Sequence, residues 1–322
     1  MVETAGPALS VVVAIVSDTT GRPDTRHLEL CLAALIRQKA AATMEIIVPH
    51  LPGMTGIAAL VEEYPTVRFV EVEGMRTYTG RSGSREHHDE LRARGLAVAR
   101  GSIIALIEDH GIPAPNWSAN VHAGLSPRFA AVGGAIENGI DRPLNWAVYF
   151  CDFIRYQNPV QAGDSAFASD ANIAYRRAAL ESIRPVWQDA FHEPSVNEAL
   201  RSRGEVVALA PDMVLYQHRQ GLRFGSALRE RFVWGRSYAA LRGRLAPQRR
   251  VLWALFSPAL PALLLARMTA IAWKKRRTLA PYLKALPLTS MLLVSWALGE
   301  LAGYVTARPA RRGRAATGGS AR

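Results

Sequence analysis

The sequence predicts an α/β protein in which helices cover both faces of a mainly parallel sheet. Three observations favour this class. Short apolar runs of strand length alternate with segments of helical spacing through the first half of the chain. The run at residues 103–107 is apolar at every position, which is typical of a strand covered on both faces. No internal repeat is visible, so a repeat architecture is not expected.

The expected elements of the first half alternate in type. Apolar runs predict strands at residues 10–16, 44–48, 67–72 and 103–107. Helical spacing predicts a helix at residues 24–38, with Asp24 or Thr25 as its cap. A second helix is expected at residues 84–100. This order indicates βαβ units and therefore parallel neighbours in the sheet.

The pattern becomes mixed from about residue 129. The sequence there predicts a strand through 133–134, a helix around 146–156, a further element at 169–180 and a helix at 194–203. The chain has 322 residues. It therefore accommodates one large α/β domain of roughly 240 residues followed by an appendage.

Composition narrows the partners and the compartment. The formal net charge of +12 calls for an anionic partner, for which nucleic acid, anionic lipid and a phosphorylated substrate all qualify. The two cysteines, Cys31 and Cys151, do not form a disulfide framework. Cys31 lies on the apolar side of a predicted helix, so we expect a buried thiol and a reducing, cytosolic setting.

Two long apolar segments near the carboxyl end carry a membrane signal. Residues 251–273 and 285–307 are each long enough to cross a hydrocarbon core of about 30 Å. Two prolines and Arg267 interrupt the first segment, and Glu300 lies in the second. The amino-terminal apolar run lacks the basic start and cleavage pattern of a signal peptide.

Basic clusters precede, separate and follow these two segments, so a spanning hairpin would put at least one cluster on the wrong side. We therefore expect helices that lie in or dip into the cytoplasmic leaflet, with basic side chains on lipid phosphates. A spanning hairpin and two water-soluble core helices are the alternatives. We expect three parts: a large α/β domain at 1–245 that carries the candidate site, a membrane-associated helical hairpin at 246–308 and a disordered basic tail at 309–322.

Three polar side chains, Glu108, Asp109 and His110, end the apolar strand at 103–107 abruptly. In an open α/β sheet the ligand crevice lies outside the carboxyl ends of the strands. Carboxylate and imidazole groups also bind divalent metal ions. The sequence therefore predicts a functional site at this strand end.

Several segments carry a resemblance to a known family. In chain order they are SVVVAIVSD, LIRQ, MEIIV, RARGLAVARGSIIALIED, SDANIAYRRAAL and FHEPSVNEALRSRG. Over about residues 9–242 they resemble family 2 glycosyltransferases of the glycosyltransferase-A fold. The resemblance implies transfer of a sugar from a nucleoside diphosphate to an acceptor, with C-terminal membrane-associated helices beside the catalytic domain.

The resemblance implies a divalent ion, Mn²⁺ or Mg²⁺, that neutralises the departing diphosphate. At the family's Asp-x-Asp motif this chain has Glu108 in the first acidic position and His110 in the second. Imidazole suits manganese better than magnesium. His218 resembles a histidine that some members direct toward the metal, although a surface histidine fits equally. Alternatively His110 is a turn residue, Asp109 or Glu108 holds the ion, or no metal is needed.

The resemblance places the family's acidic catalytic pair on His192 and Glu193. Glu193 is the expected base that removes the proton of the acceptor hydroxyl, and partial burial would give it the raised pKa that this role demands. His192 would then be its neighbour in acceptor binding. Alternatively Glu193 only stabilises the start of the following helix, and Asp189 is the base.

The donor contacts implied by the resemblance are Ser17, Asp18, Arg94, Glu108 and Asp109. Arg94 is equally explained as a solvated helix residue. A further set, Arg81, Arg85, His87 and His88, is expected in a glycine- and serine-rich loop that closes over the diphosphate, although a flexible exposed loop would show the same residues. The family's acidic residues after the second strand are replaced here by Pro49 and His50, which leaves the nucleobase open.

The acceptor side is implied at Asn172 and at Arg231 and Arg236, which lie in a predicted amphipathic helix at 229–242. The two arginines are expected to meet a phospholipid or a polyprenyl phosphate, or to lie passively on lipid. The Gln-x-x-Arg-Trp motif of processive relatives is absent, which favours addition of one sugar per encounter.

Together the residues and the resemblance predict an inverting, metal-dependent hexosyltransferase at the cytoplasmic face of a bacterial cell membrane. Its partners would be a nucleotide-sugar donor, a lipid-linked or other saccharide acceptor, and an anionic membrane surface. The alternative is a catalytically inactive relative that binds nucleotide, glycan or a partner protein. Nucleic acid is not an expected partner, because the basic tail lacks interleaved aromatics and a recognised module.

Overall fold

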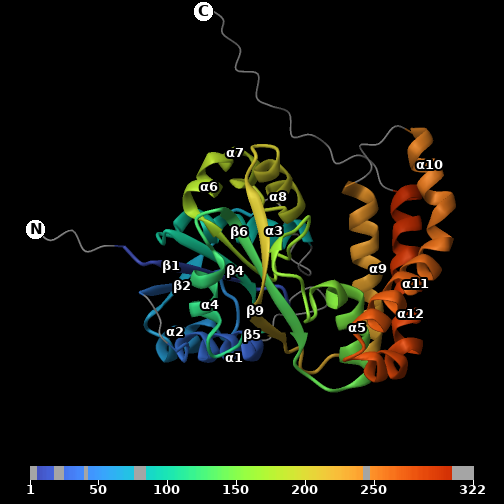
Figure 1. The fold of residues 1–322 in the computed structure, drawn as a ribbon, viewed down its shortest axis with the longest axis horizontal. Helices are drawn as coiled ribbons and strands as arrows, with labels where there is room; N and C mark the ends of the chain where they lie inside the picture. Colours follow the sequence, from blue (N-terminus) through green and yellow to red (C-terminus); the bar gives the residue numbers. More distant parts are fainter. Residues whose placement is uncertain (1–5, 18–24, 40–42, 76–84, 242–246, 307–322) are drawn as a thin grey trace, which may run out of the picture.

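The computed structural model describes residues 6–17, 25–39, 43–75, 85–241 and 247–306. In these residues the strands form one twisted sheet in the order β3-β2-β1-β4-β8-β6-β9-β5, with β7 beside β9 (Figure 1). Strands β1 to β4 are mutually parallel, and β8 lies antiparallel between β4 and β6. The predicted α/β class with a mainly parallel sheet is confirmed.

The elements have the following bounds. The strands are β1 Leu9–Ala14, β2 Met44–His50, β3 Val67–Glu71, β4 Ile103–Glu108, β5 Gly111–Pro113, β6 Phe129–Asn138, β7 Gly163–Asp164, β8 Asn172–Arg176 and β9 Val206–Gln217. The helices before the C-terminal region are α1 Thr25–Ile36, α2 Ile57–Glu63, α3 Arg85–Val98, α4 Trp117–Gly124, α5 Pro143–Phe153, α6 Arg177–Ser182, α7 Arg184–Trp187 and α8 Glu193–Arg201, with a 3₁₀ turn η2 at Ile154–Tyr156.

The four predicted strands of the first half match β1 to β4 within two residues at each end. Strands β5 and β7 were not predicted. They have three and two residues, and runs of that length carry no readable periodicity. Only pairing with β9 makes them strands.

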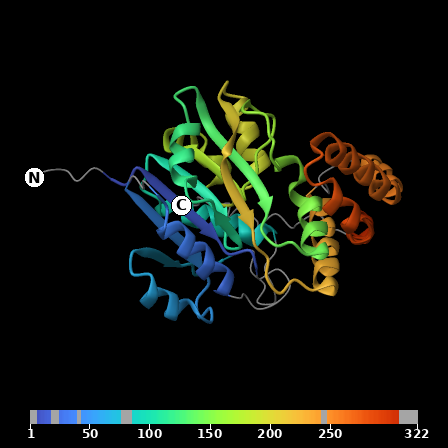
Figure 2. The ribbon, with the colours of Figure 1, turned by 60° about the horizontal axis from the view of Figure 1, so that its bottom comes forward.

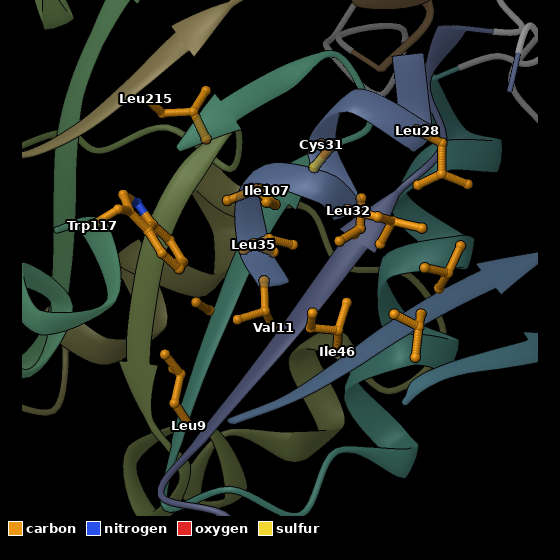
Figure 3. Close-up of a cluster of buried hydrophobic side chains, with 14 of the residues drawn as sticks. Leu9, Val11, Leu28, Cys31, Leu32, Leu35, Ile46, Ile107, Trp117 and Leu215 are labelled. Carbon is orange, nitrogen blue, oxygen red and sulfur yellow. The ribbon is translucent and has the colours of Figure 1, made fainter. Parts of the chain in front are cut away.

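Side chains of β1 alternate between two apolar layers, as the pleat of a strand requires. Val11 contributes to the layer under α1, where Cys31 is fully buried (Figure 3). Val12 contributes to the opposite layer, together with Leu96 of α3. Burial raises the pKa of the Cys31 thiol far above its usual value, in keeping with the inert, buried thiol expected from the sequence.

The C-terminal region is helical. It comprises α9 Phe224–Leu241, α10 Pro247–Phe256, the 3₁₀ turn η4 Ser257–Ala259, α11 Leu260–Lys275 and α12 Leu279–Thr306. Two stretches, Gln248–Lys275 and Leu279–Thr306, are long and apolar enough to cross a membrane by length and composition. Only 11% of the apolar window in the first is buried inside the protein, against 39% in the second.

Helix α12 packs closely on α9 through glycines. A Cβ atom at Gly299 would lie 2.1 Å from the carbonyl oxygen of Phe232, and one at Gly235 would lie 2.2 Å from that of Trp296. Small residues thus let the two helix backbones approach. Next to this contact the buried Glu300 accepts a hydrogen bond of 2.9 Å from the indole of Trp296.

We expect Gly299→Ala to destabilise the protein by about 1–3 kcal/mol, because the added methyl group meets backbone that has no free space to move into. The measurement is thermal or denaturant unfolding of the purified full chain. Gly225→Ala, near the start of α9, is the matched control because a Cβ there meets no atom within 4 Å. Equal stability of the two variants would contradict the close packing of α9 on α12.

Candidate functional site

A cavity of about 240 Å³ opens at the carboxyl ends of β1 and β4. This is the edge where open α/β sheets bind ligands. Because β8 runs antiparallel to β4, the segment that precedes β8 reaches the same edge. The lining side chains with polar or charged groups are Arg85, His88, Arg92, Glu108, His110, Asp152, Tyr156, Ser169, Asp170, Glu193, Arg219, Glu230 and Trp234.

Glu108 and His110 lie together on one wall of the cavity. Their Oε2 and Nε2 atoms are 3.3 Å apart. Burial raises the pKa of the Glu108 carboxyl, although the neighbouring His110 and Arg92 counteract the rise. The pair thus brings one carboxyl oxygen and one imidazole nitrogen next to each other at the cavity wall.

Asp109 points away from the cavity into the protein and is fully buried. It accepts hydrogen bonds from the backbone N–H of Val16 at 3.1 Å and from the Ser17 hydroxyl at 2.5 Å. Burial alone would raise its pKa, but the contacts with His110, Ser17 and Val16 lower it below its usual range. Asp109 thus ties the end of β4 to the end of β1, and Ser17 serves that tie.

Arg92 of α3 stands at the centre of the cavity's charges. Its guanidinium contacts Glu108 at 3.0 Å, Asp170 at 3.3 Å and Asp89 at 3.3 Å. The side chain is only 4% exposed. Arg92 therefore holds together carboxylates from three separate segments.

Helical spacing explains why Arg92, and not the predicted Arg94, faces the cavity. Arg85, His88 and Arg92 are separated by three and four positions and share one face of α3. Arg94 lies elsewhere on the helix, is 45% exposed at its side chain and pairs with Glu90 at 3.5 Å. The periodicity of α3 was the signal that could have identified Arg92 from the sequence.

Glu193 lines the cavity from the first turn of α8. Burial, followed by the negative charge of Asp170, raises its pKa to about 8. Asn197, one turn further along the helix, donates a hydrogen bond to its Oε1 atom. The structure thus provides a carboxyl group that holds its proton near neutral pH and releases it just above.

Two further histidines that the sequence singled out, His192 and His218, do not line the cavity. His192 is the N-cap residue of α8, where its Nδ1 atom lies 2.8 Å from the Ser195 hydroxyl, and burial lowers the pKa of its imidazole. His218 donates its backbone N–H to the carbonyl of His110 at 2.8 Å. Burial also lowers the pKa of the His218 imidazole. His218 therefore fixes the backbone at His110 without presenting its ring to the cavity.

The structure gives Asn172 a packing role. The residue is fully buried, and its amide donates to the carbonyl oxygens of Ala135 and Met213 while accepting from the Trp117 indole. Its amide nitrogen and its amide oxygen are thus both bonded within the protein. Asn172 is not available to an acceptor, contrary to the expectation from the sequence.

Arg231 also differs from its expected place. Its side chain is 3% exposed and forms a paired contact with both carboxylate oxygens of Asp152 on α5. It therefore joins α9 to α5 instead of facing lipid, because an unpaired buried guanidinium would be costly. Arg236 is exposed on the same helix. Asp18 and Arg81 lie outside the described residues.

Helix α9 supplies a wall that sequence reasoning missed. Glu230 and Trp234 line the cavity from α9, and Glu230 makes a two-pronged contact of 2.9 and 2.6 Å with Arg219, which follows β9. No spacing within the sequence connects these residues to β4. Their meeting depends on the path of the chain after β9, which only the tertiary structure reveals.

Glu108 and His110 fit two positions in the coordination sphere of a divalent ion. Neighbouring ligands of such an ion are about 3 Å apart at bond lengths near 2.1 Å, and the observed separation is 3.3 Å. Among the described residues, no three His, Cys, Asp or Glu side chains gather into a group that could hold a metal. A resident ion would therefore need further ligands from a bound diphosphate and water.

A solved structure of similar architecture decides the fold. The mannosyltransferase PcManGT from Pyrobaculum calidifontis, in complex with GDP-Man and Mn²⁺, aligns with a TM-score of 0.52 at 18% sequence identity, covering 92% of this chain and 88% of that chain. The chain has the glycosyltransferase-A fold.

Further solved structures with a weaker likeness to this glycosyltransferase-A chain are those of S. aureus TarS 1–349. One of them has a TM-score of 0.48 at 11% identity, covering 90% of this chain and 91% of that one. In complex with UDP-GlcNAc the TM-score is 0.48 at 12% identity, covering 91% and 92%. No protein-family model and no curated protein matches the sequence.

Proposed function

We propose that this protein is an inverting glycosyltransferase that moves a hexose from a nucleoside diphosphate sugar to a lipid-linked or other membrane-proximal acceptor. One observation carries the proposal. A single cavity at the ligand-binding edge of this fold holds the Glu108 and His110 pair and also Glu193 with a pKa of about 8. Such a transfer requires a base for the acceptor hydroxyl and groups that stabilise the negative charge of the leaving diphosphate. Both would face this one cavity.

Glu193 is the proposed base. In its ionised form the carboxylate accepts the proton of the acceptor hydroxyl as that oxygen attacks the anomeric carbon, and the bond to the diphosphate breaks on the opposite face. Inversion at that carbon follows from attack opposite the leaving group. A pKa of about 8 makes the carboxylate a stronger base than an ordinary glutamate while keeping part of it ionised near neutral pH.

The donor side is proposed at Glu108, His110 and the arginines. Even with Glu193 protonated, the described lining residues include four carboxyl groups against three arginines, so the protein by itself does not neutralise a bound diphosphate. Mn²⁺ or Mg²⁺ held by Glu108 and His110 would supply Lewis-acid stabilisation of the leaving phosphate. The solved complex of PcManGT with GDP-Man and Mn²⁺ supports this choice. Arg85 and Arg92, which also line the cavity, would orient the phosphates.

The acceptor is proposed to enter beside α9 at the cytoplasmic face of the cell membrane. Trp234 and Glu230 form part of the cavity wall, and the same helix packs on α12, one of the two candidate membrane helices. The proposed hairpin at 246–308 is therefore in contact with a helix that borders the cavity, which would bring a membrane-bound acceptor close to Glu193. Because α9 packs on α12, the expected domain boundary at residue 245 does not separate two independently packed parts.

A binding panel tests the proposal against a non-catalytic role. The full chain is heated with Mn²⁺ and each of several nucleoside diphosphates, and the unfolding temperature is recorded. We expect stabilisation by at least one pair, followed by release of that nucleoside diphosphate from its sugar when membrane lipid extract is added. Stabilisation without release would favour the inactive, nucleotide-binding alternative, and no stabilisation by any pair would remove the donor site.

The pH dependence of kcat/KM tests the role of Glu193. Since the base must be ionised, kcat/KM should fall as pH decreases through about 8. Asp170→Asn removes a negative charge that raises the pKa of Glu193, so the acidic limb should move to lower pH. Asp164→Asn, at an exposed carboxylate on β7, is the control and should leave the limb in place. If the acidic limb does not move in Asp170→Asn, the limb does not report the ionisation of Glu193.

A further inference from the structure

The two candidate membrane stretches expose large apolar side chains that the protein does not cover. On the first stretch Leu255 is 73% exposed and Leu263 is 65% exposed. On the second, Leu298 is 54% exposed and Val305 is 68% exposed. Apolar surface of this kind is unfavourable in water and marks an interaction surface.

The turn between the two stretches is anchored on the sheet. Arg277 forms an ion pair of 2.5 Å with Glu137 at the end of β6. Thr278 donates a hydrogen bond of 2.9 Å to the side chain of Gln157, which is fully buried. Lys275 donates to the carbonyl oxygen of Gln157 as well. The end of α11 and the start of α12 therefore lie on the same side of any membrane as the catalytic cavity.

The rest of α12 is attached to α9 along its length. The Ser295 hydroxyl donates to the carbonyl of Leu228 at 2.7 Å, and Gly299 and Gly303 contact α9 further along. At the open end of the hairpin, Arg250 of α10 donates to the backbone of Tyr304. Helix α9 is held in turn by the buried ion pairs to α5 and to the segment after β9. These contacts make the C-terminal helices one layer with α5 and α9.

The packing of α10 to α12 in one layer with α5 and α9 argues against helices that cross the bilayer. In two views, α9 to α12 form a group of helices on one side of the sheet domain, next to α5 (Figures 1 and 2). A helix that crosses needs about 30 Å of hydrocarbon around it. With α12 upright in hydrocarbon, α9 would enter with it, yet α9 is not among the candidate spans and exposes Arg236.

Charged side chains on the apolar helices fit an interfacial position. Arg267 is exposed within the first stretch and Lys284 is exposed near the start of the second. Arg249 and Lys274 are exposed near the two ends of the first stretch. Basic groups at this spacing meet phosphates when a helix lies along a leaflet, whereas Arg267 would enter hydrocarbon in an upright one.

We propose that α10, α11 and the outer side of α12 lie in a single leaflet of an anionic phospholipid bilayer, parallel to its surface, and do not cross it. The proposal deepens the membrane association proposed above and does not depend on the sugar-transfer reaction. It places both ends of the Gln248–Lys275 stretch on the cytoplasmic side, next to the catalytic cavity.

Single cysteines introduced as Arg249→Cys and Lys274→Cys test this arrangement in the full chain. A membrane-impermeant maleimide is applied to sealed inverted vesicles and to right-side-out vesicles from the expression host. We expect both cysteines to react in inverted vesicles and neither to react in right-side-out vesicles. Glu205→Cys, exposed before β9, is the positive control for the cytoplasmic side. The parent chain, with Cys31 and Cys151, gives the background labelling.

Reaction of the two cysteines from opposite sides would overturn the proposal in favour of a spanning helix. A second readout separates it from water-soluble helices. A fluorophore at Leu255→Cys should shift to the blue when vesicles containing phosphatidylglycerol are added, and shallow lipid-bound quenchers should act on it more strongly than deep ones. No shift, together with recovery of the protein in the soluble fraction, would also overturn the proposal. Neither result bears on donor binding, which is measured separately.

Discussion

Glu193→Gln is expected to reduce the turnover of sugar transfer by between about 10² and 10⁴-fold while leaving donor binding intact. The variant keeps the shape of the side chain and an oxygen that accepts the hydrogen bond from Asn197. It removes only the ability to take up a proton from the acceptor. The measurements are initial rates of nucleoside diphosphate release with acceptor present, and the unfolding temperature with Mn²⁺ and donor.

The control for this variant is Glu198→Gln, at an exposed position on the same helix. It should leave turnover unchanged. Retained turnover in Glu193→Gln would remove Glu193 as the base and would leave the donor-binding part of the proposal standing. Loss of donor-induced stabilisation in the same variant would instead show that Glu193 acts in donor binding.

Thermal unfolding checks that Glu193→Gln is folded. The raised pKa of Glu193 also predicts whether the variant is more or less stable than the parent at each pH. The folded state holds the proton of Glu193 up to about pH 8, whereas an unfolded glutamate releases it near pH 4.3. Folding therefore takes up a proton between these values, so this carboxyl lowers stability progressively as pH rises through that window. Glutamine lacks this effect. The variant should be at least as stable as the parent at pH 7.5, with a smaller difference at pH 4.5.

Glu108→Gln is expected to lower kcat/KM by on the order of 10²-fold and to abolish the stabilisation that Mn²⁺ adds to nucleoside diphosphate binding. The substitution removes the carboxylate charge that faces His110 at 3.3 Å, while the amide keeps the size of the side chain. Titration of Mn²⁺ at fixed nucleoside diphosphate, followed by unfolding temperature, measures the effect without turnover. His110→Ala should weaken the Mn²⁺ response in the same direction.

Glu71→Gln is the matched control, since Glu71 is also a carboxylate at the carboxyl end of a parallel strand but is exposed on β3 and does not line the cavity. It should leave the Mn²⁺ response unchanged. An unaltered Mn²⁺ response in both Glu108→Gln and His110→Ala would contradict the proposed ion site and would shift charge neutralisation to the arginines.

Much of the scaffold was predictable because it depends on local sequence. Apolar strands such as β4 and amphipathic helices such as α1 are specified by the periodicity of their own residues. The position of Glu108 and His110 at a ligand-binding edge followed from the same periodicity, together with the rule that parallel strands end at one edge. Glu193 came from the family resemblance, and its position in the cavity with a raised pKa came only from the structure.

The charged wall of the cavity was not predictable, because its members meet only through the tertiary fold. Arg92 contacts Asp170 across 78 positions of sequence, and Arg219 contacts Glu230 after the chain has turned from β9 into α9. The same long-range packing removed Asn172 and Arg231 from the acceptor side. Both residues have polar groups that required partners once buried, and the nearest partners lay inside the protein.

The sequence by itself determined the α/β class, the order of its first strands and helices, the strand end that carries Glu108 and His110, and two apolar helical stretches near the carboxyl end. Local periodicity and residue chemistry are sufficient for these. The tertiary structure alone decided that Asp170 reaches Arg92, that α9 closes the cavity, and that the turn after α11 is anchored to β6. These features arise from contacts between distant segments, whose geometry depends on how the whole sheet and its helices pack.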